Sequence, residues 1–146
     1  MFQQTISLIV SAMLFLTMSF ATAQMPDDWQ KRYGPPAAER YIIRDGFIMT
    51  VFYSKDRQTC KVVIEAAKLQ SSSVFNDIVD EVVPFSDRGR EGRSIGLSTG
   101  GGAGLGVKEY ERVSISLITA TDGSTKGVQS AIVQWKGTQC VLADQK

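Results

Sequence analysis

The sequence predicts an α+β domain in which one amphipathic helix packs on a mostly antiparallel sheet of about five strands, in the order β-β-β-α-loop-β-β. Two observations predict this class. One segment has helical periodicity, and five others have the alternation or the β-branched composition of strands. With 146 residues, the chain is long enough for one domain and too short for two ordinary ones.

The first half of the chain predicts a meander of three strands. Residues 40–44 form a short strand, and Asp45-Gly46 is a typical hairpin turn. Residues 47–53 are apolar on both faces, as expected of an interior strand, and residues 59–65 return as the third strand.

The helix is predicted over residues 73–83. Serines precede it as candidate N-caps, and Pro84 ends it because a residue before proline disfavours the α conformation. Its apolar side chains fill one half of a helical wheel and its polar side chains the other: Val74, Phe75, Ile78, Val79, Val82 and Val83 against Asn76, Asp77, Asp80 and Glu81. This pattern predicts a helix that lies on a core.

The segment 85–106 is predicted to be a long loop rich in glycine and arginine. A connection of this length without its own structure is uncommon in a compact domain, and it is usually functional or disordered. Residues 110–119 and 128–135 then predict a closing hairpin.

The first 23 residues predict a signal peptide. They carry no charged side chain, residues 6–20 are almost wholly apolar, and a small-x-small motif precedes Gln24. The alternative is a retained membrane anchor, but the apolar run is short for a membrane span. We expect export with cleavage, a secreted or periplasmic location and no membrane contact afterwards. The mature chain then consists of an irregular N-terminal arm over 24–38 and a single domain over 39–146.

The two cysteines, Cys60 and Cys140, both lie in the mature part. An exported protein with two cysteines most simply forms one disulfide. Free thiols or a redox pair are the alternatives, although redox sites usually place their cysteines close together in the sequence.

Composition and motifs argue against several ligands. There are 16 basic and 15 acidic residues, so the charge favours no nucleic-acid partner. The glycines at 101–106 are followed by Val107, where a phosphate-binding loop requires lysine. We therefore expect no cofactor.

Arginines in the 85–106 segment form the one candidate binding cluster. Arg88, Arg90 and Arg93, with Lys108 further on, could bind an anion, an acidic polymer or a protein partner. Two acidic residues interrupt the cluster, so a solvated loop is the alternative.

The chain contains no histidine, which excludes histidine-dependent nucleophilic catalysis and histidine-ligated zinc. The carboxylates Asp77, Asp80 and Glu81 fall on the predicted solvent face of the helix, where side chains are hydrated and not held in a fixed position. We therefore predict no catalytic residue and no metal site.

A few short segments resemble small exported bacterial proteins of unknown function. They cover less than a third of the chain: Tyr33-Gly34-Pro35-Pro36, Glu39-Arg40-Tyr41, Asp45-Gly46 and residues 60–65. The resemblance implies a secreted or periplasmic bacterial setting and transfers no activity.

These observations together favour a non-catalytic exported binding or structural domain, with its variable surface in the 85–106 loop. One alternative is a module that binds anions or acidic polymers through that loop. The other is an enzyme that uses carboxylates without histidine.

Overall fold

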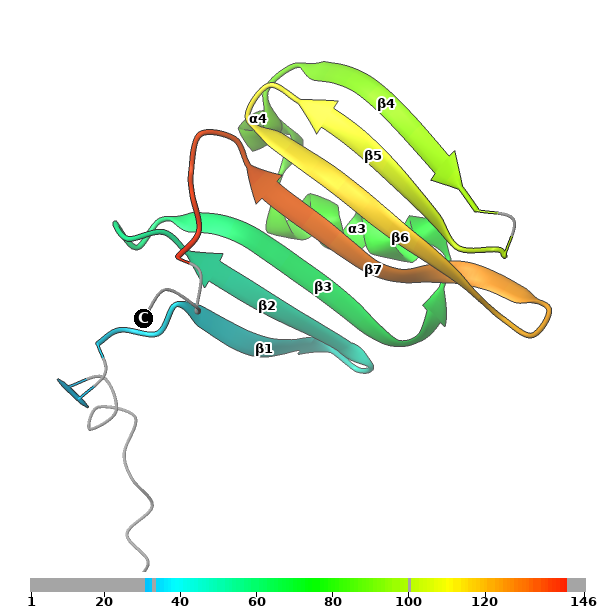
Figure 1. The fold of residues 1–146 in the computed structure, drawn as a ribbon, viewed down its shortest axis with the longest axis horizontal. Helices are drawn as coiled ribbons and strands as arrows, with labels where there is room; N and C mark the ends of the chain where they lie inside the picture. Colours follow the sequence, from blue (N-terminus) through cyan, green and yellow to red (C-terminus); the bar gives the residue numbers. More distant parts are fainter. Residues whose placement is uncertain (1–30, 33, 100, 142–146) are drawn as a thin grey trace, which may run out of the picture. The chain divides into compact units, whose positions relative to one another are not determined.

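The computed structural model describes residues 31–32, 34–99 and 101–141. The chain divides into two compact units, Met1–Pro35 and Pro36–Lys146, and the sheet and the core belong to the second (Figure 1). The predicted signal peptide, residues 1–23, lies outside the described residues, as does most of the predicted arm. Among the residues that are described, no helix is long and apolar enough to span a membrane.

The second unit contains one seven-stranded antiparallel sheet in the order β1-β2-β3-β7-β6-β5-β4. The strands are β1 Ala38–Arg44, β2 Phe47–Tyr53, β3 Thr59–Gln70, β4 Glu91–Ser98, β5 Gly104–Tyr110, β6 Val113–Asp122 and β7 Thr125–Trp135. The helices are α3 Ser72–Val82 and α4 Phe85–Arg88. The sheet is two meanders, β1–β3 and β4–β7, joined where β3 pairs with β7.

The predicted fold class is therefore wrong. Over its described residues the second unit is mostly sheet, with seven strands and two short helices, rather than one helix on five strands. The error lies in the 85–106 segment, which folds into α4, β4 and the start of β5 instead of a loop. Glycines give this segment a low intrinsic strand propensity, and the pairing of β4 with β5 overrides it.

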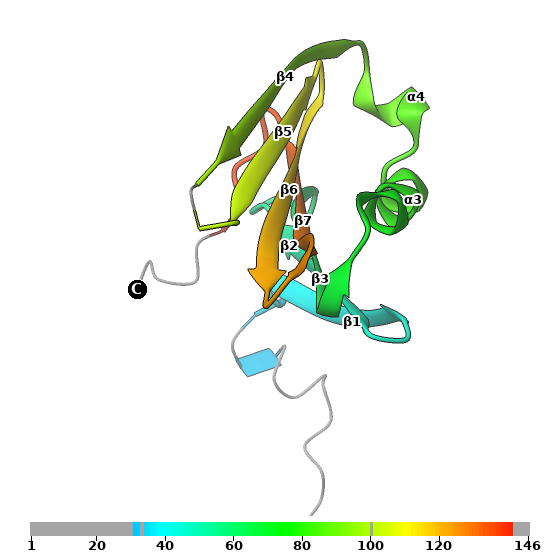
Figure 2. The ribbon, with the colours of Figure 1, turned by 90° about the vertical axis from the view of Figure 1, so that its right-hand side faces the viewer.

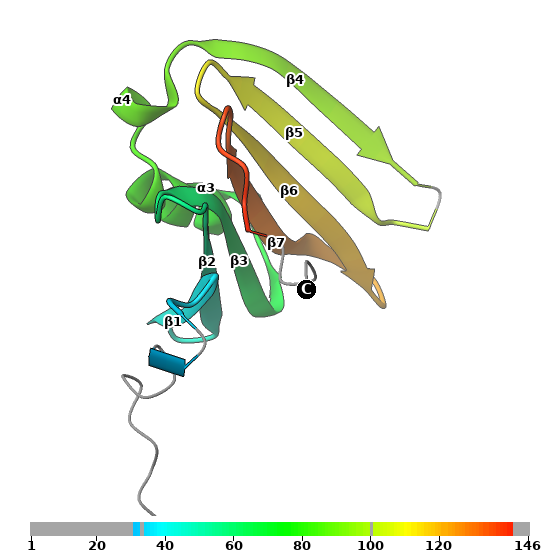
Figure 3. The same ribbon diagram turned by 60° about the vertical axis from the view of Figure 1, so that its left-hand side comes forward.

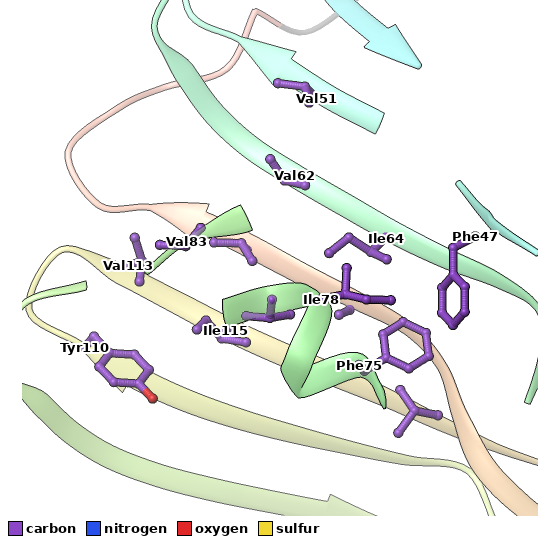
Figure 4. Close-up of a cluster of buried hydrophobic side chains, with 14 residues drawn as sticks. Phe47, Val51, Val62, Ile64, Phe75, Ile78, Val83, Tyr110, Val113 and Ile115 are labelled. Carbon is purple, nitrogen blue, oxygen red and sulfur yellow. The ribbon is translucent and has the colours of Figure 1, made fainter. Parts of the chain in front are cut away.

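Helix α3 covers Ser72–Val82, within one residue of the predicted span. Ser71 caps its N-terminus by accepting a hydrogen bond from the Val74 amide. The helix buries its apolar half against the middle of the sheet, and Phe75 meets Phe47 edge-to-face at 5.5 Å between ring centroids. The core side chains from the helix, the β2–β3 pair and the β6–β7 pair meet in one cluster (Figure 4).

Both helices lie on the same side of the sheet (Figure 2). Since side chains alternate between the faces of a strand, the register places a second apolar group on the opposite side. There Ile95 pairs with Val107, and Leu97 pairs with Leu105 beside Ile118. Ile95 and Leu97 are 50% and 62% exposed. Among the described residues, the helices thus cover part of one face of the sheet, and no helix lies on the other face.

Candidate functional site

A groove lies between α3 and the strands β4, β5 and β6. The helix packs on the middle of the sheet near β7, and it leaves β4 and β5 uncovered (Figure 3). The groove has a volume of about 380 Å³, which falls in the range of small-molecule sites. Its lining includes Asn76 from α3, Gly96 from β4, Gly106 and Lys108 from β5, and Ile115 and Leu117 from β6.

Two glycines form the floor of the groove. Gly96 and Gly106 are cross-strand partners, and Gly106 also pairs with Leu117. A Cβ atom at either glycine would meet no atom within 4 Å, and neither residue has a positive φ. Gly102 is different, because its φ is +85° and a Cβ there would collide with Thr121. The fold therefore requires glycine at position 102 but not at 96 or 106.

A glycine inside a strand costs roughly 0.5–1 kcal/mol relative to alanine. At Gly96 and Gly106 no turn, bulge or close backbone approach explains that cost. Because these two residues have no side chain, open space remains above β4 and β5, beside α3. Residues that lower stability without a structural reason are expected at functional sites. Gly96 and Gly106 therefore indicate that the groove binds something.

Polar groups stand at the rim of the groove. Lys108 Nζ lies 3.6 Å from Glu91 Oε1, and both side chains are more than half exposed. Asn76 is exposed on the adjacent turn of α3. The aliphatic walls from Ile115 and Leu117 lie below. This arrangement suits a ligand with a compact apolar group and an acidic head that reaches the ammonium and the amide.

The four predicted anion contacts occupy different environments. Lys108 lies at the groove. Arg90 is exposed, with its Nε 3.6 Å from Glu111 Oε2, and Arg93 lies on the exposed strand β4. Arg88, by contrast, is only 2% exposed. The carboxylates of this chain thus already engage Arg88, Arg90 and Lys108.

Arg88 holds the end of α3 against α4. Its Nε donates to the Val83 carbonyl at 2.8 Å, and its guanidinium lies 2.5 Å from Asp80 Oδ1. The guanidinium also lies 4.1 Å from the centre of the Phe85 ring and 5.5 Å from that of Tyr110. The sequence alone does not reveal this role of Arg88. The segment that contains it is predicted to be a loop, but it folds as α4 and brings Arg88 back to the end of α3.

The two cysteines form a disulfide, as predicted. Cys60 and Cys140 are bonded with their Cα atoms 5.3 Å apart, which joins the start of β3 to the C-terminal tail. The bond is reinforced by the Val141 amide, which donates to the Tyr53 carbonyl at 3.0 Å. A hollow of about 660 Å³ beside the bond is lined mainly by polar turn residues.

A cluster of polar side chains surrounds the Glu39 carboxylate on the edge strand β1. Tyr41 and Tyr53 both donate hydrogen bonds to Glu39, the latter at 2.9 Å. These two phenols, with Arg57 3.7 Å away, hold the pKa of Glu39 below its ordinary value of 4.5 despite partial desolvation. The hydrogen bond to Glu39 also raises the pKa of Tyr41. The polar side chains of Glu39 and Tyr41 on this edge strand thus bond within the protein.

Within the described ranges no group of three His, Cys, Asp or Glu side chains is placed to hold a metal ion. Comparison of the chain with protein families, curated proteins and solved structures finds no match.

Proposed function

We propose that the protein is an exported binding domain whose ligand site is the groove between α3 and the β4–β5 pair. The observation that carries the proposal is the glycine floor, because Gly96 and Gly106 open the groove at a cost that the fold does not require. The groove combines this floor with aliphatic walls and a rim that carries Lys108 and Asn76.

The chemistry of the groove indicates the class of ligand. Ile115 and Leu117 suit an acyl or aromatic group, and the Lys108 ammonium suits a carboxylate or sulfonate on the same molecule. Glu91 competes for that ammonium at 3.6 Å, but the pair is exposed and worth little on its own. An acidic head group can therefore replace Glu91 without a large penalty.

Export is supported by the predicted signal peptide and by the disulfide, which is stable in oxidising compartments. The mass of the protein recovered from the culture medium or periplasm tests this part. Export with cleavage predicts a chain that begins at Gln24 and contains the intact disulfide. A protein that stays in the cell at full length contradicts it.

The groove is tested with anilinonaphthalene sulfonate, a fluorescent apolar anion, and the chain from Gln24 onward, which keeps the compact unit intact. Gly106→Val places a branched side chain at the groove, and we expect the fold to be retained because a Cβ at this position meets no atom within 4 Å and valine favours strands. We expect the dissociation constant for the probe to rise at least about tenfold, since its apolar group loses the floor of the site.

Gly101→Val is the matched control. A Cβ at Gly101 also meets no atom within 4 Å and its φ is not positive, but the residue lies outside the groove. This variant should bind the probe as the unmodified chain does. Lys108→Gln should weaken binding and reduce its dependence on salt, because an ionic contact is lost. Equal affinities for the Gly106 and Gly101 variants would contradict the proposal.

A further inference from the structure

The free edge of β4 differs from a normally protected sheet edge. Natural sheets block their edges with charged side chains, proline, bulges or a covering segment. In β4 the only register shift lies between Glu91 and Ser94, and the five residues Ser94–Ser98 then pair with β5 one by one. These five residues contain no charge and no proline, and every one is exposed.

The five residues have an almost symmetric order. Ser94-Ile-Gly-Leu-Ser98 alternates small and aliphatic residues in the same way from either end, with Gly96 at its centre. In an antiparallel pair of two identical strands centred on Gly96, Ile95 of one copy faces Leu97 of the other, and Ser94 faces Ser98. Directly opposed side chains share a face of the sheet and stabilise it when they match.

The surrounding side chains fit the same pairing. Val107 and Leu105 of β5 are the cross-strand neighbours of Ile95 and Leu97. Pairing two copies would therefore extend one aliphatic strip across both sheets, on the face without helices. The charged residues Glu91 and Arg93 lie outside the symmetric stretch, so no like charges face each other.

We propose that two copies of this chain associate through β4, with their strands antiparallel and a two-fold axis at Gly96. Among the described residues no strand pairs with the outer edge of β4, and the backbone groups of such an edge suit an extended strand as their partner. The symmetric order of the five residues favours an identical strand, because an isologous interface must be complementary to itself. This inference rests on the backbone edge of β4 and not on ligand binding, although Ser94, Ile95 and Gly96 also line the groove.

The association is tested by sedimentation of the chain from Gln24 over a range of concentrations. We expect the mass to double as concentration rises, and Ile95→Lys to lower the association constant at least about tenfold. Ile42→Lys is the matched control, since Ile42 is an exposed isoleucine on the other edge strand, β1, and is 85% exposed. It should leave association unchanged.

The register has its own test. Leu97→Glu alone should also prevent self-association, because each glutamate then faces an isoleucine. When Ile95→Lys and Leu97→Glu chains are mixed, the lysine of one faces the glutamate of the other, and a heterodimer should form. If pairing were centred on Ile95 instead, the lysine would face Ile95 of the other copy, and mixing would restore nothing.

Hydrogen exchange provides a readout without any substitution. Amides within Ser94–Ser98 should exchange more slowly at high protein concentration than at low concentration, whereas amides of β1 should not change. A chain that stays monomeric throughout, or a dimer that is disrupted equally by Ile42→Lys and Ile95→Lys, overturns the proposal. A mixture of the two β4 variants that stays monomeric overturns the pairing at Gly96.

Discussion

The two edges of the sheet are built in opposite ways. On β1 the side chains interact with their own protein: Tyr41 and Tyr53 bond to Glu39, and Arg44 pairs with Glu81 of α3. On β4 the residues Ser94–Ser98 are uncharged and exposed. Charged groups on an edge strand discourage pairing with another chain. The difference indicates that the β1 side closes the fold and the β4 side is available for binding.

The two sides are also fastened differently. The disulfide ties the C-terminal tail to β3, next to the β1–β2 pair. On the other side Arg88 holds α4, the segment that leads into β4. The β4 side is thus held by the buried Arg88 and by strand pairing with β5, whereas the β1 side has a covalent bond next to it.

The largest expected effect comes from removing the covalent bond. The disulfide spans a sequence separation of 80 residues. On the chain-entropy model, a loop of that size stabilises the folded state by about 4 kcal/mol. The Cys60→Ser, Cys140→Ser double variant should lose about this much free energy of unfolding, measured by urea denaturation. A loss below about 1 kcal/mol contradicts the role of the bond as a staple.

Arg88→Ala should have the next largest effect. The substitution leaves the Val83 carbonyl without its donor, removes the partner of Asp80 and uncovers Phe85. We expect a loss of about 2–3 kcal/mol in the free energy of unfolding. Arg90→Ala is the control, because that side chain is 91% exposed, and it should change stability by less than about 0.5 kcal/mol. Equal losses in the free energy of unfolding for the two variants would contradict a structural role for Arg88.

The smallest effect concerns the protonation of β1. Because the pKa of Glu39 is lowered in the folded state, its contribution to stability is present above pH 4.5 and is lost as the pH falls through the folded pKa. Tyr41→Phe removes the largest cause of the shift, so the Glu39 pKa should rise toward 4.5 in an NMR titration. Tyr110→Phe is a control with no such contact. An unchanged Glu39 titration in Tyr41→Phe would show that the hydrogen bond from Tyr41 does not lower the pKa of Glu39.

The sequence was informative on the β1 side and misleading on the β4 side. Strand β2 falls on the predicted residues 47–53, and α3 lies within one residue of its predicted span, because periodicity and turn residues agree there. The pairing of Cys60 with Cys140 followed from the number of cysteines, their wide spacing and the predicted export. Strand β4 could not be predicted in the same way, because its conformation depends on pairing with β5 across a glycine-rich turn.

The candidate site was harder to predict than the fold. The charge of Lys108 predicts an anion contact, and Lys108 does lie at the groove, but as a single rim residue and not as part of an arginine cluster. The helical pattern places Asn76 on the polar face of the helix, and nothing in the neighbouring sequence indicates that β4 and β5 lie beside it. Gly96 and Gly106 could have drawn attention only as glycines in an alternating segment, a pattern that also describes an ordinary loop.

The central claim is that the β4 side of the sheet binds ligand and the β1 side does not. An NMR titration of the chain from Gln24 with anilinonaphthalene sulfonate tests it most directly, because every backbone amide reports separately. We expect the largest shifts at Gly96, Gly106 and Leu117, and none at Glu39 or Tyr41. Shifts concentrated on β1, or spread evenly over both sides of the sheet, would contradict the account.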